Sequence, residues 1–389
     1  MRRAAAEWLG GRERAHAEPG DAPRLEHLAP VLEAMPDPVL LVDADGRIAA
    51  ANAPARGRWA IAGDVIRLSA VIRHPPLLDA VRATGHDGSP RSVEYVFSAR
   101  SDEHFLCSIA PVSWRGVTGT LIVLRDRTEQ IVAERMRSDF VANASHELRT
   151  PLSALSMLIE TISGHARDNP ADREKFLRMM QAQADRMSRL IDDLLSLSRI
   201  ELDEHVPPSD RVDLMTVVRE AADASAPIAA GRDVRIEIAG DGGAWVVGDR
   251  FQIAQVAQNL IDNAVKFSPP GGAVTVTVGL AQDREEALAR SARAWDASDR
   301  LSMLAPAPAA GRSFAYLRVA DSGPGIPRRF LPRLGERFFR VEREEGADRG
   351  GTGLGLAIVK HIVNRHRGGL AVETLPGVGS AFAVYFERA

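Results

Sequence analysis

Two long stretches with an apolar residue at every third or fourth position predict a pair of amphipathic helices within residues 128–206. The apolar face of the first helix is formed by Phe140, Ala144, Leu148, Leu152, Leu155, Ile159 and Ile162. The apolar face of the second is formed by Phe176, Met180, Met187, Leu190, Leu194 and Leu197. A hairpin of two such helices buries too little apolar surface alone, so we expect two copies to form a four-helix bundle. An intramolecular bundle is the alternative, but no third helix is predicted to complete it.

Shorter apolar runs separated by turn residues precede the hairpin. Strands are expected at residues 39–42, 47–51, 105–112 and 119–124. The first two flank the turn-forming sequence at residues 43–46 and predict a β-hairpin. We therefore expect a separate domain over residues 26–127, preceded by a flexible arm at residues 1–25 that is rich in Ala, Gly, Arg and Pro.

A mixed pattern of helices and strands follows the hairpin, after a stiff Pro-rich linker at residues 207–210. Elements are expected at 214–229 (helix), 234–238 (strand), 245–247 (strand), 250–267 (helix) and 316–320 (strand). Residues 211–389 thus form an α/β domain, with Asp249 capping the helix that begins at residue 250. A charged stretch at residues 281–312 departs from this pattern, and we expect it to be a helical surface insertion without a catalytic role.

Charge and composition exclude several functions. Acidic and basic residues nearly balance, with a formal net charge of -3, so no bulk electrostatic argument points to nucleic acid. The single cysteine, Cys107, excludes an internal disulfide and predicts a small core residue in a strand. No run of about 18 apolar residues predicts a membrane span, and the N-terminus lacks the apolar core of a signal peptide. We therefore expect a cytoplasmic protein, with membrane association only through a missing N-terminal segment or a partner.

The first candidate for chemistry is His146, which lies off the apolar face of the first long helix. Glu147 is its neighbour, and Thr150 follows one turn along the same side. A solvent-facing imidazole would therefore have a carboxylate and a hydroxyl within reach. From spacing alone, ordinary solvated helix surface remains the alternative. We further expect Thr128 to cap this helix and Pro151 to bend it.

The second candidate is a nucleotide site in the C-terminal domain. Asn259 and Asn263 are four residues apart on one predicted helix, with Lys266 a turn further on. Glycine-bearing loops follow at residues 321–327, 350–356 and 377–381. Glycine is needed where a backbone approaches a phosphate or purine closely, and a helix N-terminus supplies free amides to an anion.

These motifs together resemble those of a known family. Residues 145–152, Ser-His-Glu-Leu-Arg-Thr-Pro-Leu, resemble the phospho-acceptor box of sensor histidine kinases. The Asn helix and the glycine loops resemble, in order, the N, G1, F, G2 and G3 boxes of the GHKL ATP-binding fold. Residues 26–127 resemble a PAS sensor domain. The resemblance implies a multidomain α/β protein: a PAS α+β domain, an antiparallel helical hairpin that forms a dimeric four-helix bundle, and a GHKL (Bergerat) α/β sandwich.

The resemblance implies an ATP-dependent protein-histidine kinase, of EC 2.7.13.3 type, that uses ATP and Mg²⁺. His146 would accept the phosphoryl group and pass it to an aspartate of a cognate response regulator, in a homodimer without direct nucleic-acid binding. Glu147 would assist the forward transfer, and Thr150 would orient water for dephosphorylation of the regulator. Residues 134–140 and 190–201 resemble phosphate-regulon sensor kinases of alphaproteobacteria, which makes phosphate starvation a hypothesis for the stimulus.

The nucleotide contacts implied by the resemblance are Asn259, Asn263, Lys266, Asp321, Gly323, Gly325, Phe338, Arg340, Gly351, Thr352, Gly353, Leu354 and Gly355. Asn263 would hold the magnesium ion, and Lys266 and Arg340 would neutralise phosphate charge. Asp321 would accept the adenine amino proton, and the glycine amides would contact the phosphates. Phe338 would pack at the hinge of a lid over residues 341–349.

The sequence argues against a cofactor in the sensor domain and against two other classes of function. His74 and His104 are the only ring ligands to consider for haem, and Cys107 lies outside a flavin photochemistry motif, so we expect no cofactor there. A repair- or chaperone-type GHKL ATPase would lack the phospho-acceptor box. A non-catalytic signalling scaffold would have lost Asn263, Asp321 or a loop glycine, and all are present.

Overall fold

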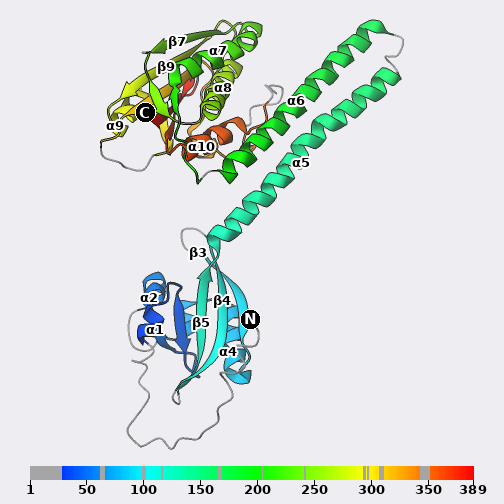
Figure 1. The fold of residues 1–389 in the computed structure, drawn as a ribbon. Coiled ribbons are helices and arrows are strands. Elements are labelled where there is room, and N and C mark those ends of the chain that lie inside the picture. The colour runs from blue at the N-terminus through cyan, green and yellow to red at the C-terminus, as the bar shows by residue number, and fades with distance from the viewer. Residues whose placement is uncertain are drawn as a thin grey trace, which may run out of the picture. The chain divides into compact units, whose positions relative to one another are not determined.

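The computed structural model describes residues 29–61, 66–98, 102–114, 117–164, 169–203, 205–240, 242–291, 295, 298–305, 311–341 and 351–389. The chain divides into two compact units, Met1–Asp139 and Phe140–Ala389. Each unit has its own hydrophobic core and is described separately (Figure 1). The predicted arm at residues 1–25 and, of the predicted lid at residues 341–349, all but Val341 lie outside the described residues.

The first unit is built on a five-stranded antiparallel sheet with strand order β2-β1-β5-β4-β3. Its strands are β1 (Val39–Val42), β2 (Ile48–Ala51), β3 (Arg91–Ser98), β4 (Asp102–Trp114) and β5 (Val117–Asp126). Its helices are α1 (Ala29–Glu33), α2 (Ala53–Trp59), α3 (Leu68–Val71) and α4 (Pro75–Asp87). The predicted β-hairpin at residues 39–51 is confirmed, because β1 pairs antiparallel with β2. Cys107 is a buried strand residue, as expected, and burial raises its pKa to about 12.

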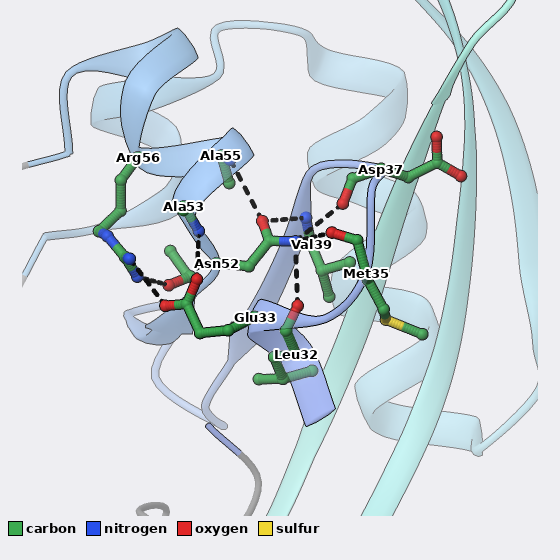
Figure 2. Close-up of polar contacts among 10 residues, drawn as sticks. Leu32, Glu33, Met35, Asp37, Val39, Asn52, Ala53, Ala55 and Arg56 are labelled. Carbon is green, nitrogen blue, oxygen red and sulfur yellow. Dashed lines mark hydrogen bonds and ion pairs between the residues drawn. The ribbon is translucent and has the colours of Figure 1, made fainter. Parts of the chain in front are cut away.

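Asn52 ties the start of this unit together (Figure 2). Its side chain is fully buried, and its Oδ1 accepts hydrogen bonds from the amides of Val39 at 2.9 Å and Ala55 at 3.2 Å. Its Nδ2 donates to the carbonyl oxygens of Leu32, Met35 and Asp37. One amide side chain therefore satisfies backbone groups of α1, β1 and α2 that would otherwise be buried without partners.

The last strand of the sheet leads directly into the long helix α5 (Thr128–Ser163). The prediction that Thr128 caps this helix is wrong. Thr128 is its first helical residue, and its hydroxyl accepts a hydrogen bond from the His104 amide at 2.8 Å. The Asp126 carboxylate instead accepts from the Thr128 amide at 2.8 Å and caps the helix start.

The two predicted long helices are present as α5 and α6 (Pro170–Leu202). Figure 1 shows them as an antiparallel pair. Asn169 caps α6 by accepting from the amides of Ala171 and Asp172. Helix α5 continues through Pro151, which is buried, so the bend at this position stays a prediction. In the described part of the chain, no helix combines the length and the apolar character that a membrane crossing requires.

The apolar face of α5 is only partly covered within one copy of the chain. Leu152 is 55% exposed and Ile159 is 51% exposed, although both belong to the predicted apolar face. Met157 on the same helix is 68% exposed. On α6, Leu190 and Leu197 are buried in the core that the hairpin shares with the C-terminal domain. The hairpin thus leaves apolar surface on α5 that nothing in the described part of one chain covers.

The C-terminal domain contains a six-stranded sheet with strand order β10-β12-β13-β11-β9-β7 and a separate pair, β6-β8. Its strands are β6 (Arg211–Asp213), β7 (Arg235–Gly240), β8 (Trp245–Val247), β9 (Ala273–Ala281), β10 (Asp299–Leu304), β11 (Phe314–Asp321), β12 (Gly369–Leu375) and β13 (Gly379–Glu387). Its helices are α7 (Leu214–Gly231), α8 (Arg250–Phe267), α9 (Arg284–Ser291), the 3-10 helix η3 (Arg328–Arg333) and α10 (Gly355–Arg365). The strands pair antiparallel except β7 and β9.

Helices α7, α8 and α10 share the main core with one face of the six-stranded sheet. Val256, Leu260 and Ile261 of α8 are buried there, so the polar residues of α8 project away from the sheet. The predicted cap is confirmed, because the Asp249 carboxylate accepts from the amides of Phe251 and Gln252. The core thereby fixes the helix that carries Asn259 and Asn263.

The prediction of a purely helical insertion at residues 281–312 is wrong. Among the described residues of this segment, α9 alone is helical, and the segment then returns as β10, which pairs antiparallel with β12 at the edge of the sheet. Helix α9 packs on the sheet face opposite to α8, where Ala287 is buried with Phe314, Tyr316 and Tyr385. The insertion is therefore a structural part of the sheet.

Candidate functional site

The candidate phospho-acceptor, His146, is exposed on α5. Glu147 is half-buried, and its carboxylate lies 3.6 Å from the Arg186 guanidinium on α6. The Thr150 hydroxyl donates to the His146 carbonyl oxygen at 3.3 Å, one turn back along the helix. His146 is exposed as expected, while the reach of Glu147 and Thr150 to its ring stays a prediction. Arg186 is an additional residue that the sequence did not single out.

Arg186 restrains Glu147, because the ion pair joins the two helices of the hairpin. Both side chains are only about a third exposed, at 27% and 30%, so the pair is less screened than a fully exposed one. The Glu147 carboxylate is therefore held toward α6 rather than free in solvent. Helical spacing could not have identified Arg186, since it lies in another helix 39 positions along the chain.

The candidate nucleotide site begins where α8 faces the start of α10. The Asn259 side-chain amide donates to the Gly355 carbonyl oxygen at 3.4 Å. A methyl group added at Gly355 would lie 3.5 Å from Asn259 Oδ1 and 3.8 Å from Asn263 Nδ2. Both asparagines are half-buried. Two polar side chains thus converge on the N-terminus of α10, whose first amides are free to bind an anion.

The loop before α10 approaches Lys266 closely. A side chain at Gly351 would collide with the Lys266 ammonium group, and Gly351 has a φ of 146°. Gly353 has a φ of 71°, and a side chain there would lie 2.8 Å from the Phe338 backbone. The Phe338 amide donates to the Gly353 carbonyl oxygen at 3.0 Å. Positive φ favours glycine at both positions, and at Gly353 the Phe338 backbone also leaves no space for a side chain.

Asp321 lies at the end of β11 and is only 9% exposed. Its Oδ1 accepts hydrogen bonds from the amides of Gly323 at 2.8 Å and Ser380 at 3.3 Å. Gly325 has a φ of 69°, and a side chain there would collide with the Leu375 carbonyl oxygen. Two backbone amides thus fix the orientation of a buried carboxylate, which suits it to read one hydrogen-bonding edge of a base.

Thr352, Phe338 and Arg337 connect the candidate nucleotide site to the hairpin. The Thr352 hydroxyl donates to the Asp193 carboxylate of α6 at 2.8 Å and accepts from the Leu354 amide at 3.2 Å. Burial raises the pKa of Asp193. The Phe338 ring lies 6.0 Å from the Phe140 ring of α5.

Arg337 adds an ion pair to this contact by bonding Glu201 of α6. No local sequence signal pointed to Asp193 or Glu201, because each pairs with a residue more than a hundred positions away.

The remaining predicted residue, Arg340, is exposed and immediately precedes the predicted lid at residues 341–349. Its contact with phosphate stays a prediction. Within the described residues, no group of three His, Cys, Asp or Glu side chains could hold a metal ion. A magnesium ion held by Asn263 together with nucleotide phosphates is compatible with this, since Mg²⁺ keeps several ligands that the protein does not supply.

A buried histidine fixes the start of α8. His366 is 7% exposed, its Nε2 accepts from the Asp249 amide at 3.0 Å, and its Nδ1 lies 2.8 Å from the Ile362 carbonyl oxygen. These partners require a neutral ring with the proton on Nδ1. Burial lowers the pKa of His366 from its ordinary value of 6.5, and the nearby Arg365 charge acts in the same direction.

We expect the C-terminal domain to lose stability as the pH falls below about 6.5, the ordinary pKa of histidine. Below that pH the unfolded chain binds a proton at residue 366 that the folded chain does not, so protonation favours unfolding. Urea unfolding at pH 7.5 and pH 5.5 measures the effect. In a His366→Asn variant the difference between the two pH values should shrink, and an unchanged difference would show that other groups cause it.

Comparisons with known proteins agree with this geometry. Residues 136–203 match the His Kinase A (phospho-acceptor) domain family, and residues 248–389 match the histidine kinase-, DNA gyrase B- and HSP90-like ATPase family. The phosphate regulon sensor protein PhoR of Pseudomonas aeruginosa is 34% identical over 69% of this chain and 54% of its own length. The sensor-like histidine kinase SenX3 of Mycolicibacterium smegmatis is 33% identical over 68% of this chain and 61% of its own.

A third relative covers more of the chain. The alginate biosynthesis sensor protein KinB of Pseudomonas aeruginosa is 29% identical over 91% of this chain and 56% of its own length. The chain thus spans about half the length of the curated relatives that it matches. Among solved structures, histidine kinase ThkA in complex with response regulator protein TrrA aligns over 92% of this chain and 98% of its own at 19% identity, with a TM-score of 0.45.

Proposed function

Because this chain belongs to the sensor histidine kinases of two-component systems, we propose that it transfers the γ-phosphoryl group of ATP to His146 and then to an aspartate of a response regulator. The proposal rests mainly on one observation: a candidate phospho-acceptor and a candidate ATP site occur in the same unit of the chain. An exposed histidine stands in a phospho-acceptor hairpin, and a glycine loop faces Asn259 and Asn263 in the ATPase domain that follows it. An ATPase that transfers no phosphoryl group to a histidine would need only the ATPase domain.

The forward transfer uses the imidazole of His146 as the nucleophile. One ring nitrogen attacks the γ-phosphorus in line, the bond from that phosphorus to the β,γ-bridging oxygen breaks, and ADP leaves. Glu147 accepts or orients the proton on the other ring nitrogen, which keeps the attacking lone pair free. The ion pair with Arg186 supports this role, since it holds the carboxylate in place before the reaction.

The C-terminal domain binds and orients ATP. Asp321, fixed by two backbone amides, accepts a hydrogen bond from the adenine amino group. Lys266 and the amides at residues 351–355 contact the phosphates. Asn263 would hold Mg²⁺ through its side-chain oxygen, and the ion would supply positive charge against the phosphates. Thr352 and Phe338 contact the hairpin, so the ATP-binding domain must rearrange for the phosphoryl group to meet His146.

Two copies of the chain form the active enzyme. The exposed side chains of Leu152, Met157 and Ile159 support this, because a second hairpin packed against α5 would cover them. The same bundle would present the surface around His146 to the receiver domain of the response regulator. A homodimer and a regulator are therefore the expected partners.

The first unit is proposed to be a PAS-type sensor domain. Its five-stranded antiparallel sheet, with β5 leading directly into α5, supports a role in relaying a signal to the hairpin. The similarity to PhoR supports a stimulus related to phosphate. The resemblance to alphaproteobacterial kinases in particular stays a prediction.

Dephosphorylation of the response regulator separates the role of Thr150 from that of His146. A Thr150→Ala variant should still acquire label from ATP, because its hydroxyl bonds only to the helix backbone and takes no part in the forward step. It should leave a phosphorylated regulator intact, because the water for hydrolysis is no longer oriented. The purified chain and this variant are each incubated with γ-labelled ATP and Mg²⁺, then with the response regulators of the host.

The proposal expects label to move from the chain to one regulator, and to leave that regulator faster with the unaltered chain than with Thr150→Ala. A Ser153→Ala variant on the same helix serves as the control. Absence of any label on the unaltered chain would contradict the proposal. Equal regulator dephosphorylation by both proteins would contradict the role of Thr150 alone.

A further inference from the structure

The segment between β9 and β11 makes contacts that its charged composition did not suggest. We call residues 282–304, which contain α9, Trp295 and β10, the insert. Its strand β10 is in register with β12, so that Arg300 lies opposite Glu373 and Leu301 lies opposite Val372. The insert thus covers the edge of the sheet next to the strand that precedes the last glycine loop.

Glu373 is a buried carboxylate that depends on the insert. It is 2% exposed, and its Oε1 accepts from the Arg300 guanidinium at 3.1 and 3.2 Å. The Ser298 hydroxyl also donates to this oxygen, and the Trp295 amide lies 3.4 Å from it. A buried charge is strongly unfavourable unless donors surround it, and here three residues of the insert provide them.

The residue after Glu373 holds the loop of the candidate adenine site. The Thr374 hydroxyl accepts from the Ile326 amide at 2.8 Å and donates to the Gly379 carbonyl oxygen at 3.1 Å. The neighbouring Ser380 amide donates to Asp321. The turn from β12 to β13 therefore fixes both Asp321 and the loop at residues 321–327.

Trp295 reaches the same turn from the outside. A methyl group added at Gly379 would lie 3.2 Å from the Trp295 ring and would also collide with the Asp321 carbonyl oxygen. Gly379 is thus enclosed between the indole ring and the backbone of Asp321. The insert therefore contacts the turn at two points, through the charge on Glu373 and through the Trp295 ring.

We propose that the insert positions the adenine-binding carboxylate, with Arg300 and Trp295 as positioning residues that act through Glu373 and Gly379 on Asp321. The proposal rests on the proposed function, since it requires that Asp321 bind adenine. It assigns to the insert a role in nucleotide affinity and base selectivity, beyond completing the edge of the sheet. Neither residue belongs to the candidate nucleotide contacts, so we expect the chemical step itself not to depend on them.

The test compares Arg300→Ala with Arg290→Ala, a matched control in the same insert. Arg290 pairs with Glu286 on the surface of α9, at 2.6 Å and with its side chain 57% exposed. Autophosphorylation is measured over a range of ATP and of GTP concentrations, and unfolding is followed for each variant.

We expect Arg300→Ala to raise KM for ATP about tenfold, a change that corresponds to about 1.4 kcal/mol. The rate at saturating ATP should stay near that of the unaltered chain. The preference for ATP over GTP should fall, because the adenine contact is loosened while the phosphate contacts remain. The Arg290→Ala control should match the unaltered chain in all three quantities.

A second variant separates positioning from stability. Adding Glu373→Gln to Arg300→Ala removes the buried charge that has lost its Arg300 partner, so the double variant should recover most of the ATP affinity. Trp295→Leu leaves the charged contacts intact and should lower base selectivity with little loss of stability. If Arg300→Ala does not fold, the Trp295→Leu variant tests the proposal in its place.

The outcomes are distinguishable. A raised KM with lowered base selectivity supports the proposal. Variants that are less stable but keep the ATP KM and the base selectivity of the unaltered chain would overturn it, since the insert would then only stabilise the sheet. An unaltered chain that binds no ATP would contradict the proposed function itself.

Discussion

A His146→Ala variant is expected to acquire no phosphate from ATP while it still binds ATP. The alanine removes the imidazole that is proposed to accept the phosphoryl group. Of its neighbours, Glu147 is paired with Arg186 and the Thr150 hydroxyl is bonded to the helix backbone, so we expect neither to replace it. Label from γ-labelled ATP, followed on the intact chain, measures the loss. Binding of a fluorescent ATP analogue should be unchanged, because the candidate nucleotide site lies on α8 and α10.

The matched control for this prediction is His86→Ala, which removes an exposed histidine from α4 in the other unit. It should be labelled like the unaltered chain. Since His146 is exposed, its replacement should not disturb folding, and equal unfolding midpoints for the two variants would establish this. Label that persists at a histidine in His146→Ala would show that another residue is the acceptor.

An Asn263→Ala variant is expected to lose at least about 100-fold in the rate of autophosphorylation, the loss typical of removing one group that stabilises charge in a transition state. Asn263 lies half-buried on α8 and faces the start of α10. If Asn263 holds Mg²⁺ as proposed, the alanine removes the side-chain oxygen that would bind the ion beside the phosphates. The rate is followed by label from γ-labelled ATP, and the affinity for ATP is titrated with and without Mg²⁺.

The expected signature is specific to the metal. Mg²⁺ should strengthen ATP binding by the unaltered chain, and chelation should remove that gain. In Asn263→Ala the affinities with and without Mg²⁺ should converge. A Phe251→Ala variant, at an 84% exposed position on the same helix, should behave like the unaltered chain. A full Mg²⁺ effect in Asn263→Ala would refute the assignment of this residue as the metal ligand.

Local signals predicted much of the fold. The turn at residues 43–46 between two apolar runs marked the β1–β2 hairpin, and Asp249 before an amphipathic stretch marked the start of α8. Both depend on residues that are close in sequence. The same holds for the two long helices, whose apolar spacing was sufficient to identify them.

Elements that depend on distant partners were not predicted. Strand β10 forms because β12, about 70 positions later, offers a sheet edge, and its own sequence is short and surrounded by charged and Ala-Pro residues. Thr128 looked like a helix cap, but its hydroxyl bonds to His104 on the neighbouring strand. Tertiary contacts of this kind override local preference.

In the candidate site, too, local sequence signals predicted some residues and distant contacts determine others. Motif spacing identified Asn259, Asn263 and the glycine loop, which the structure brings together at the start of α10. The partners that orient the site came only from the structure, namely Arg186 for Glu147 and Ser380 for Asp321. Each bond joins different secondary-structure elements, so no periodicity in the sequence could reveal it.

The most direct test of the central claim is to locate the phosphate. The purified chain is incubated with γ-labelled ATP and Mg²⁺, digested under alkaline conditions that preserve phosphohistidine, and its labelled peptide is sequenced by mass spectrometry. The account predicts a single labelled peptide with the phosphate on His146 and a bond that is stable in base and lost in acid. Phosphate on a serine, threonine or another histidine, or none at all, would contradict it.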